Sequence, residues 1–113
     1  MTAPRRVHLL QLLSDLQHEL QQMGCWEQSA PTAQALQSQQ PFCVDTLEFT
    51  QWLQWLFIPR MQALIHSEQA LPSQCAICEM AEMVYREQRV RVDSLLRCLK
   101  SIDVAITEPY QVH

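Results

Sequence analysis

The sequence predicts an all-α fold: a compact antiparallel bundle of four or five helices formed by one domain, residues 1–113. Only one of the 113 residues is glycine, whereas sheets and hairpins depend on glycine for turns with positive φ. Apolar residues make up 48% of the chain, enough to fill one core. They recur in stripes spaced like the turns of a helix. We expect the two ends, residues 1–4 and 107–113, to be flexible.

The first helix is expected to run from Ala3 to Met23. Pro4 suits its first turn, because the N–H that proline lacks has no helical partner there. Gly24 follows the last apolar position, where a residue with positive φ commonly ends a helix. The single apolar stripe of this helix consists of Leu9, Leu13, Leu16, Leu20 and Met23.

Residues 25–40 are a predicted connector, because they are mostly polar and contain Pro31. One helical turn is expected within Ser29–Leu36, and nothing longer. We expect Trp26 to fold back and cover the end of the core.

The third helix has the clearest predicted start. Asp45 is the expected N-cap, and Glu48 three residues later completes a capping box. Val44 and Phe49 occupy the two positions of a hydrophobic staple around that cap. The helix is predicted to continue until Leu71-Pro72-Ser73 separates it from the next one.

This third helix is predicted to be apolar on two sides. Its broad apolar arc consists of Phe49, Trp52, Leu53, Leu56, Phe57, Ala63 and Leu64. A second apolar side, among glutamines, consists of Leu47, Trp55, Ile58 and Ile65. Such a helix lies centrally in a bundle or presents an apolar surface to a partner. Trp55 is therefore either part of the core or an exposed anchor for a partner.

Pro59 is expected to kink this central helix, because it cannot donate a hydrogen bond to the carbonyl of Trp55. The kink is either purely architectural or helps to shape a recognition surface. The candidate partner surface consists of Phe42, Leu47, Trp55, Ile58, Pro59 and Arg60. It would bind a protein partner, or a second copy of the chain in a weak homodimer.

Two further helices are predicted, from Ser73 to Gln88 and from Arg89 to Ile106. The first buries Ile77, Met80, Ala81, Val84 and Tyr85. The second has a stripe that consists of Val92, Leu95, Leu99, Ile102 and Ile106. The sequence leaves open whether these are two helices or one long one.

The net charge of −4 argues against a general nucleic-acid binder, which needs a positive field to capture phosphate. Five of the eight basic residues nevertheless form one candidate RNA-facing patch, which consists of Arg86, Arg89, Arg91, Arg97 and Lys100. The simplest interpretation is a solvated helix face supported by the i,i+4 pairs Glu82–Arg86 and Asp93–Arg97. The alternative is weak direct RNA binding.

The chain is expected to be cytoplasmic and to make no membrane contact. No apolar run approaches the roughly 18 residues of a transmembrane helix. Polar residues from Asp15 onward interrupt any signal-peptide pattern. In a reducing compartment the five cysteines are expected to be mostly free thiols.

Cys75 and Cys78 form the one motif that suggests chemistry. A zinc site would need a second pair of ligands nearby, and the other cysteines and histidines stand singly. A helix N-terminus would lower the pKa of Cys75, but no βαβ unit of a thioredoxin-like fold accompanies it. We expect no metal, no cofactor and no catalytic residue. A thiol-based redox protein that uses Cys75 and Cys78 is the alternative.

Several short motifs carry a family resemblance that covers about Val7 to Ile106. The most specific are Pro41-Phe42, Asp45-Thr46, Gln51-Trp52-Leu53-Gln54-Trp55 and Phe57-Ile58-Pro59-Arg60-Met61. With these motifs the chain resembles the YqcC-like family, small bacterial helical proteins whose genes often lie beside that of a tRNA pseudouridine synthase. The resemblance implies a non-catalytic accessory protein without a cofactor, and such a synthase is the expected partner.

Overall fold

The computed structural model describes residues 4–67, 77–86 and 92–107, and within these ranges every regular element is a helix. The predicted all-α class is confirmed. The α-helices are α1 (Pro4–Gln22), α2 (Ala33–Leu36), α3 (Phe49–Trp52), α4 (Ile58–His66), α5 (Ile77–Val84) and α6 (Asp93–Thr107). A 3-10 turn, η1 (Pro41–Cys43), precedes α3, and a π-helical turn, η2 (Leu53–Phe57), joins α3 to α4.

The first helix has nearly the predicted bounds, and its end is fixed by Gly24. Gly24 has φ of 75°, a conformation that glycine adopts without steric cost. Its N–H donates to the carbonyl of Gln21 at 3.0 Å, and the N–H of Cys25 donates to that of Leu20 at 2.9 Å. This pair of bonds is a Schellman motif, which satisfies the last free carbonyls of α1.

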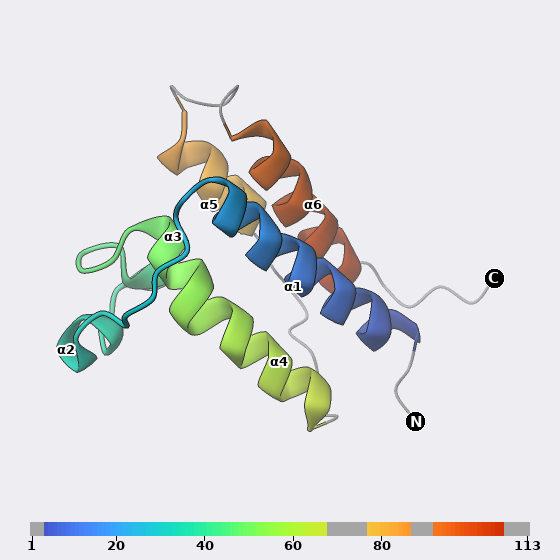
Figure 1. The fold of residues 1–113 in the computed structure, drawn as a ribbon, viewed down its shortest axis with the longest axis horizontal. Helices are drawn as coiled ribbons and strands as arrows, with labels where there is room; N and C mark the ends of the chain where they lie inside the picture. Colours follow the sequence, from blue (N-terminus) through green and yellow to red (C-terminus); the bar gives the residue numbers. More distant parts are fainter. Residues whose placement is uncertain (1–3, 68–76, 87–91, 108–113) are drawn as a thin grey trace.

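The bundle is arranged around α1, which lies between α4 and α6 and runs antiparallel to both (Figure 1). Helix α5 packs against α6 in the opposite direction (Figure 1). The sequence left open whether the last two helices were continuous. The structure separates them into two helices that lie side by side.

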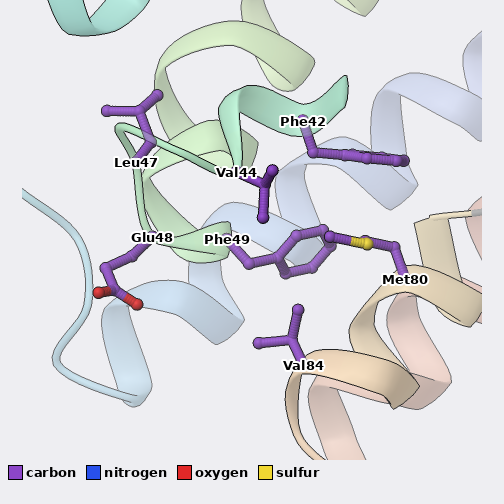
Figure 2. Close-up of a pocket in the computed structure, with 7 residues that line it drawn as sticks. All are labelled: Phe42, Val44, Leu47, Glu48, Phe49, Met80 and Val84. Carbon is purple, nitrogen blue, oxygen red and sulfur yellow. The ribbon is translucent and has the colours of Figure 1, made fainter. Parts of the chain in front are cut away.

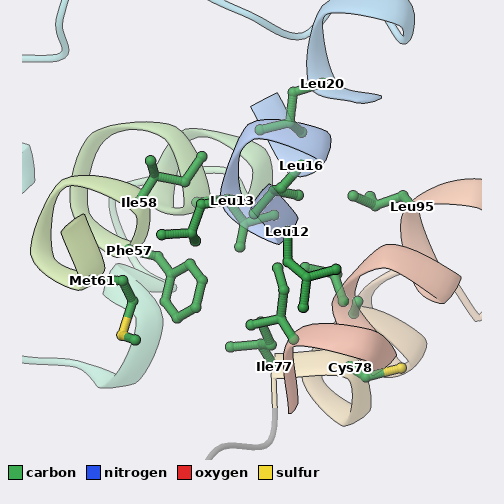
Figure 3. Packing of buried hydrophobic residues seen from close by; sticks show 14 of the residues in the cluster. Leu12, Leu13, Leu16, Leu20, Phe57, Ile58, Met61, Ile77, Cys78 and Leu95 are labelled. Carbon is green, nitrogen blue, oxygen red and sulfur yellow. The ribbon is translucent and has the colours of Figure 1, made fainter. Parts of the chain in front are cut away.

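The core is filled mainly by the leucine stripe of α1. Figure 3 shows these side chains between those of η2 and α4 on one side and those of α5 and α6 on the other. Leu9, Leu16 and Leu20 have no exposed surface. Leu95, Leu99 and Ile102 of α6 are equally buried, so both predicted stripes are confirmed.

The predicted start of the third helix is wrong by three residues. Glu48, not Asp45, is the N-cap, and the capping box is completed by Gln51, whose Oε1 accepts the N–H of Glu48 at 2.8 Å. The Asp45 carboxylate instead accepts a hydrogen bond from the hydroxyl of Ser38 in the connector. With Glu48 as the N-cap, Val44 and Phe49 no longer occupy the two positions of a hydrophobic staple.

The predicted irregularity at Pro59 takes the form of the π-turn η2, which directly precedes the proline. Within it the N–H of Ile58 donates to the carbonyl of Leu53, five residues back. A π-turn holds more residues than an α-turn and shifts the direction of every later side chain. Pro59 then lies in the first turn of α4, where its missing N–H is tolerated.

This phase shift overturns the predicted second apolar side. Ile58 and Ile65 are 3% and 2% exposed, because the π-turn rotates them into the core. Leu47 is also buried, at 8%. Ala63, which was assigned to the buried arc, is exposed.

Some predictions concern residues outside the described ranges. These are the flexible ends at 1–3 and 108–113, the Leu71-Pro72-Ser73 separator, Cys75, Arg89 and Arg91.

Candidate functional site

The segment that runs from η1 to the start of α3, residues 41–49, has an unusual backbone. Phe42 and Cys43 have φ of 57° and 50°, a left-handed conformation that costs non-glycine residues about 1–2 kcal/mol each. The carbonyl of Cys43 accepts the N–H of Leu47 at 2.8 Å, which closes the following turn. The hydroxyl of Thr46 donates to the carbonyl of Ala35 at 2.8 Å and ties this turn to α2. The shape of the segment is therefore fixed on two sides.

This segment and α5 enclose an apolar groove with a volume of about 160 Å³. In Figure 2, Val44 and Val84 point toward the ring of Phe49 from opposite sides. Hereafter "the groove" means the hollow lined by Phe42, Val44, Leu47, Glu48, Phe49, Met80 and Val84.

Aromatic rings fix the position of Phe49 beneath the groove. Its ring centroid lies 6.0 Å from that of Trp52 and 6.4 Å from that of Tyr85. The ring of Phe42 meets Trp52 edge-on, with 4.7 Å between centroids. Edge-on and offset pairs of this kind add to the packing energy of each ring. Burial also raises the pKa of Tyr85.

The surroundings of the groove are acidic. The two segments that form it, residues 41–49 and 77–86, contain four acidic residues and one basic residue. Glu48 lines the groove directly, and its side chain is exposed. Of the four acidic residues, Glu48 is the one that lines the groove, which therefore combines an apolar floor with one carboxylate on its rim.

The Gln51-Trp52-Leu53-Gln54-Trp55 motif holds the connector through Glu27. The side-chain amide of Gln54 bonds to both backbone groups of Glu27, at 2.8 Å each. The Glu27 carboxylate accepts the indole N–H of Trp55 at 3.0 Å and the amide N–H of Gln51 at 3.2 Å. The polar residues of this motif therefore fix the connector to the third helix.

The candidate partner surface is divided by the structure. Leu47 and Ile58 are buried in the chain's own core, and Trp55 is half-buried against Glu27. Pro59 and Arg60 are exposed on α4 but do not line the groove. Phe42 and Leu47 do line it. The structure thus brings two of the six residues together at one hollow.

The candidate basic patch is described only at Arg86, Arg97 and Lys100, and all three are exposed. Arg97 forms the expected i,i+4 ion pair with Asp93, with 2.6 Å between Nη2 and Oδ2. The two side chains are 79% and 55% exposed, so the pair contributes little to stability. This pairing reduces the positive charge that the patch would offer to RNA.

Cys78 lies at the start of α5 as a buried thiol rather than an activated one. Burial and its hydrogen bond to Glu82 raise the pKa of Cys78 to about 11. Cys98 is half-buried, and burial likewise raises its pKa to about 11. A thiol that stays protonated near neutral pH is a poor nucleophile and a poor metal ligand.

The first turn of α5 is capped by Asp103 of α6. Its carboxylate accepts the N–H of Ile77 at 3.1 Å and that of Cys78 at 2.8 Å. Asp103 is only 7% exposed. Two charge-assisted bonds to free N–H groups at a helix N-terminus stabilise both the carboxylate and the helix.

In the described part of the chain, no group of three or more histidine, cysteine or acidic side chains could hold a metal ion. Within the same residues, no helix combines the length and apolar character needed to cross a membrane.

Sequence reasoning did not assign several residues of these sites. Glu27 and Asp103 stand alone in polar contexts, and only the folded chain brings them to their partners. Met80 and Val84 were assigned to the buried face of their helix, whereas Val84 is 44% exposed beside the groove. The helical spacing of Met80 and Val84 was a usable signal for a shared face.

The fold and the site define a small all-α protein with an acidic-rimmed apolar groove. Residues 8–105 match the family DUF446, which is described as "tRNA pseudouridine synthase C". The chain belongs to this family. The solution NMR structure of protein YqcC from Escherichia coli has a similar fold, with a TM-score of 0.85 and 27% identity over 98% of this chain and 95% of that one.

Three relatives illustrate the range of the family. An uncharacterized protein from Haemophilus influenzae is 46% identical over 68% of this chain and 73% of its own length. The uncharacterized protein YqcC of Escherichia coli is 35% identical over 96% of this chain and 97% of that protein. A protein of Pectobacterium carotovorum named tRNA pseudouridine synthase C is 31% identical over 93% of this chain, which spans only 28% of that relative.

Proposed function

We propose that this chain is a non-catalytic, cytoplasmic accessory protein that binds a tRNA pseudouridine synthase and assists its action on tRNA. The observation that carries the proposal is the Pectobacterium carotovorum relative. That protein is named tRNA pseudouridine synthase C, and it contains a segment similar to 93% of this chain within 28% of its length. In one polypeptide, two modules meet at a high effective concentration. A separate chain must achieve the same association through a binding surface.

The charge of the chain fits an accessory role. With a net charge of −4 it would bind tRNA phosphates weakly by itself. A synthase must carry the positive surface that captures tRNA, so the partner rather than this chain supplies RNA affinity. The ion pair of Arg97 with Asp93 in the candidate basic patch supports this division of roles.

The residues described also support a non-catalytic role. The redox alternative uses Cys75 and Cys78, of which only Cys78 lies in the described residues. Its pKa is raised to about 11. The Asp103 carboxylate is occupied by two backbone N–H groups rather than directed at a hollow. The groove contains no histidine, cysteine or lysine among its lining residues.

Deletion of the gene tests the proposal. We expect lower pseudouridine occupancy at the tRNA site of the partner synthase, with normal occupancy restored by a plasmid copy. Affinity-tagged chain from the native host should co-elute with the synthase. Unchanged pseudouridine in the deletion strain, together with no complex at micromolar concentrations, would refute the accessory role.

A further inference from the structure

We infer that the groove receives one apolar side chain, of the size of leucine or phenylalanine, from a basic segment on the surface of a tRNA pseudouridine synthase. This inference rests on the proposed function and assigns its binding surface. Four observations carry it: the exposed apolar rim, the size of the hollow, its fixed shape and its charge.

Exposed apolar side chains gather at this place. Of the five large apolar residues that are exposed in the described ranges, two line the groove: Val44, which is 59% exposed, and Val84, which is 44% exposed. The other three, Val7, Met83 and Val104, are not among its lining residues. Clustered exposed apolar residues mark interaction surfaces, whereas single ones are ordinary.

The size of the hollow suits one anchor residue. An apolar cavity of about 150 Å³ is known to hold a benzene molecule, and the groove measures about 160 Å³. Its floor is the Phe49 ring, which Trp52 and Tyr85 hold in place. Phe42, one of the two residues with a left-handed backbone, also lines the groove. A preformed pocket of this kind is typical of an interface hot spot, because little ordering entropy is lost on binding.

The charge around the groove selects the partner. Glu48 is the one charged residue among those that line the groove, and no basic residue lines it. The chain as a whole carries a net charge of −4. A second copy of this chain would bring the same acidic rim against itself in a symmetric dimer, which like charges disfavour. A tRNA-binding enzyme has basic surface segments, and these complement the rim.

Matched valine-to-glutamate variants test the assignment. Val84→Glu and Val44→Glu place a charge at the groove, whereas Val104→Glu and Val7→Glu place the same charge at positions of similar exposure, 38% and 55%, on α6 and α1. Binding to the purified synthase of the same host would be measured by isothermal titration calorimetry. All four variants are first checked for unchanged circular dichroism and thermal midpoint. We expect them to fold normally, because substitutions at exposed positions usually change stability little.

The groove variants are expected to weaken synthase binding at least about tenfold, as loss of an anchor pocket does, while the control variants bind like wild type. To test the role of charge, Glu48→Gln at the groove is compared with Gln62→Lys on α4, since each change raises the net charge of the chain by one. Glu48→Gln should weaken binding about twofold to fivefold and reduce its salt dependence, and Gln62→Lys should not.

The outcomes separate this inference from the proposed function. If wild-type chain binds the synthase and both groove variants bind equally well, the groove assignment is wrong and the accessory role stands. If the controls lose affinity as much as the groove variants, the assignment is also overturned. If wild-type chain does not bind the synthase at all, the proposed function itself fails. Self-association that the groove variants abolish would identify a second copy as the occupant and overturn the inference.

Discussion

Gln54 and Glu27 are joined by two hydrogen bonds, in which the Gln54 amide accepts the N–H and donates to the carbonyl of Glu27, both at 2.8 Å. A buried side chain thus supplies both backbone groups of a loop residue with a partner. The second glutamine of the family-specific motif therefore has a structural role. It fixes the connector against η2.

Gln54→Ala should lower the free energy of unfolding by about 2 kcal/mol, because it leaves two backbone groups of Glu27 without partners in a site where Gln54 is only 5% exposed. Urea denaturation followed by circular dichroism measures this change. Gln62→Ala on the exposed face of α4 is the control and should stay within about 0.5 kcal/mol of wild type. Equal destabilisation by the two changes would argue against a stabilising role of the two hydrogen bonds between Gln54 and Glu27.

Asp103→Ala should destabilise the protein by about 2 kcal/mol, since α5 loses the carboxylate that binds its first N–H groups. Asp103→Asn keeps one acceptor oxygen and should cost less. Hydrogen exchange provides the site-specific readout: the amides of Ile77 and Cys78 should lose protection more than those of α1. Unchanged protection at these two amides would contradict the cap.

Cys78 and Cys98 should react slowly with iodoacetamide at pH 8. Their pKa values are raised to about 11 by burial, so the thiolate fraction at pH 8 is about one in a thousand. Site-resolved mass spectrometry gives the rates, and the urea-unfolded chain is the control that should react much faster. A fast reaction of Cys78 in the folded protein would show an activated thiol and would support the redox alternative.

The same thiols predict how stability depends on alkaline pH. Because the folded-state pKa lies above the ordinary value of 9.0, the folded chain holds more protons between pH 9 and 11. Their contribution to stability is complete below about pH 9 and is lost as the pH rises through 11. Replacing Cys78 and Cys98 by alanine should flatten this part of the curve. If the free energy of unfolding of the double variant falls with pH at the same slope, other groups cause the loss of stability.

Trp55→Phe should cost about 1 kcal/mol of stability and leave synthase binding unchanged. The indole N–H of Trp55 bonds to Glu27 within the chain, so its loss removes one hydrogen bond and no groove contact. Chemical denaturation and calorimetric titration of the same sample measure both effects. Strong loss of binding with unchanged stability would indicate that Trp55 is part of the surface that binds the synthase.

The sequence predicted the parts of this fold that depend on local pattern. The ends of α1 followed from its leucine stripe and Gly24, and the stripe of α6 from its period, because each requires only residues close in the chain. The start of α3 was misplaced because Asp45 and Glu48 match a capping box, whereas the left-handed turn at Phe42 commits Asp45 to Ser38.

The remaining errors have a common physical origin in tertiary structure. A uniform helical wheel cannot place Ile58 and Ile65 once a π-turn has shifted the phase between α3 and α4. Hydrogen bonds such as that from the N–H of Cys78 to the carboxylate of Asp103 join residues 25 positions apart, and no local sequence pattern reveals them. The groove requires segment 41–49 and α5 to meet in space, so only Phe42 and Leu47 were named beforehand.

Sedimentation velocity of the purified chain mixed with the tRNA pseudouridine synthase of its host, without RNA, tests the central claim most directly. We expect a complex that sediments faster than either protein alone at micromolar concentration. The Val104→Glu variant should form the same complex. Independent sedimentation of the two proteins at tens of micromolar would contradict the claim that this chain is a partner of the synthase.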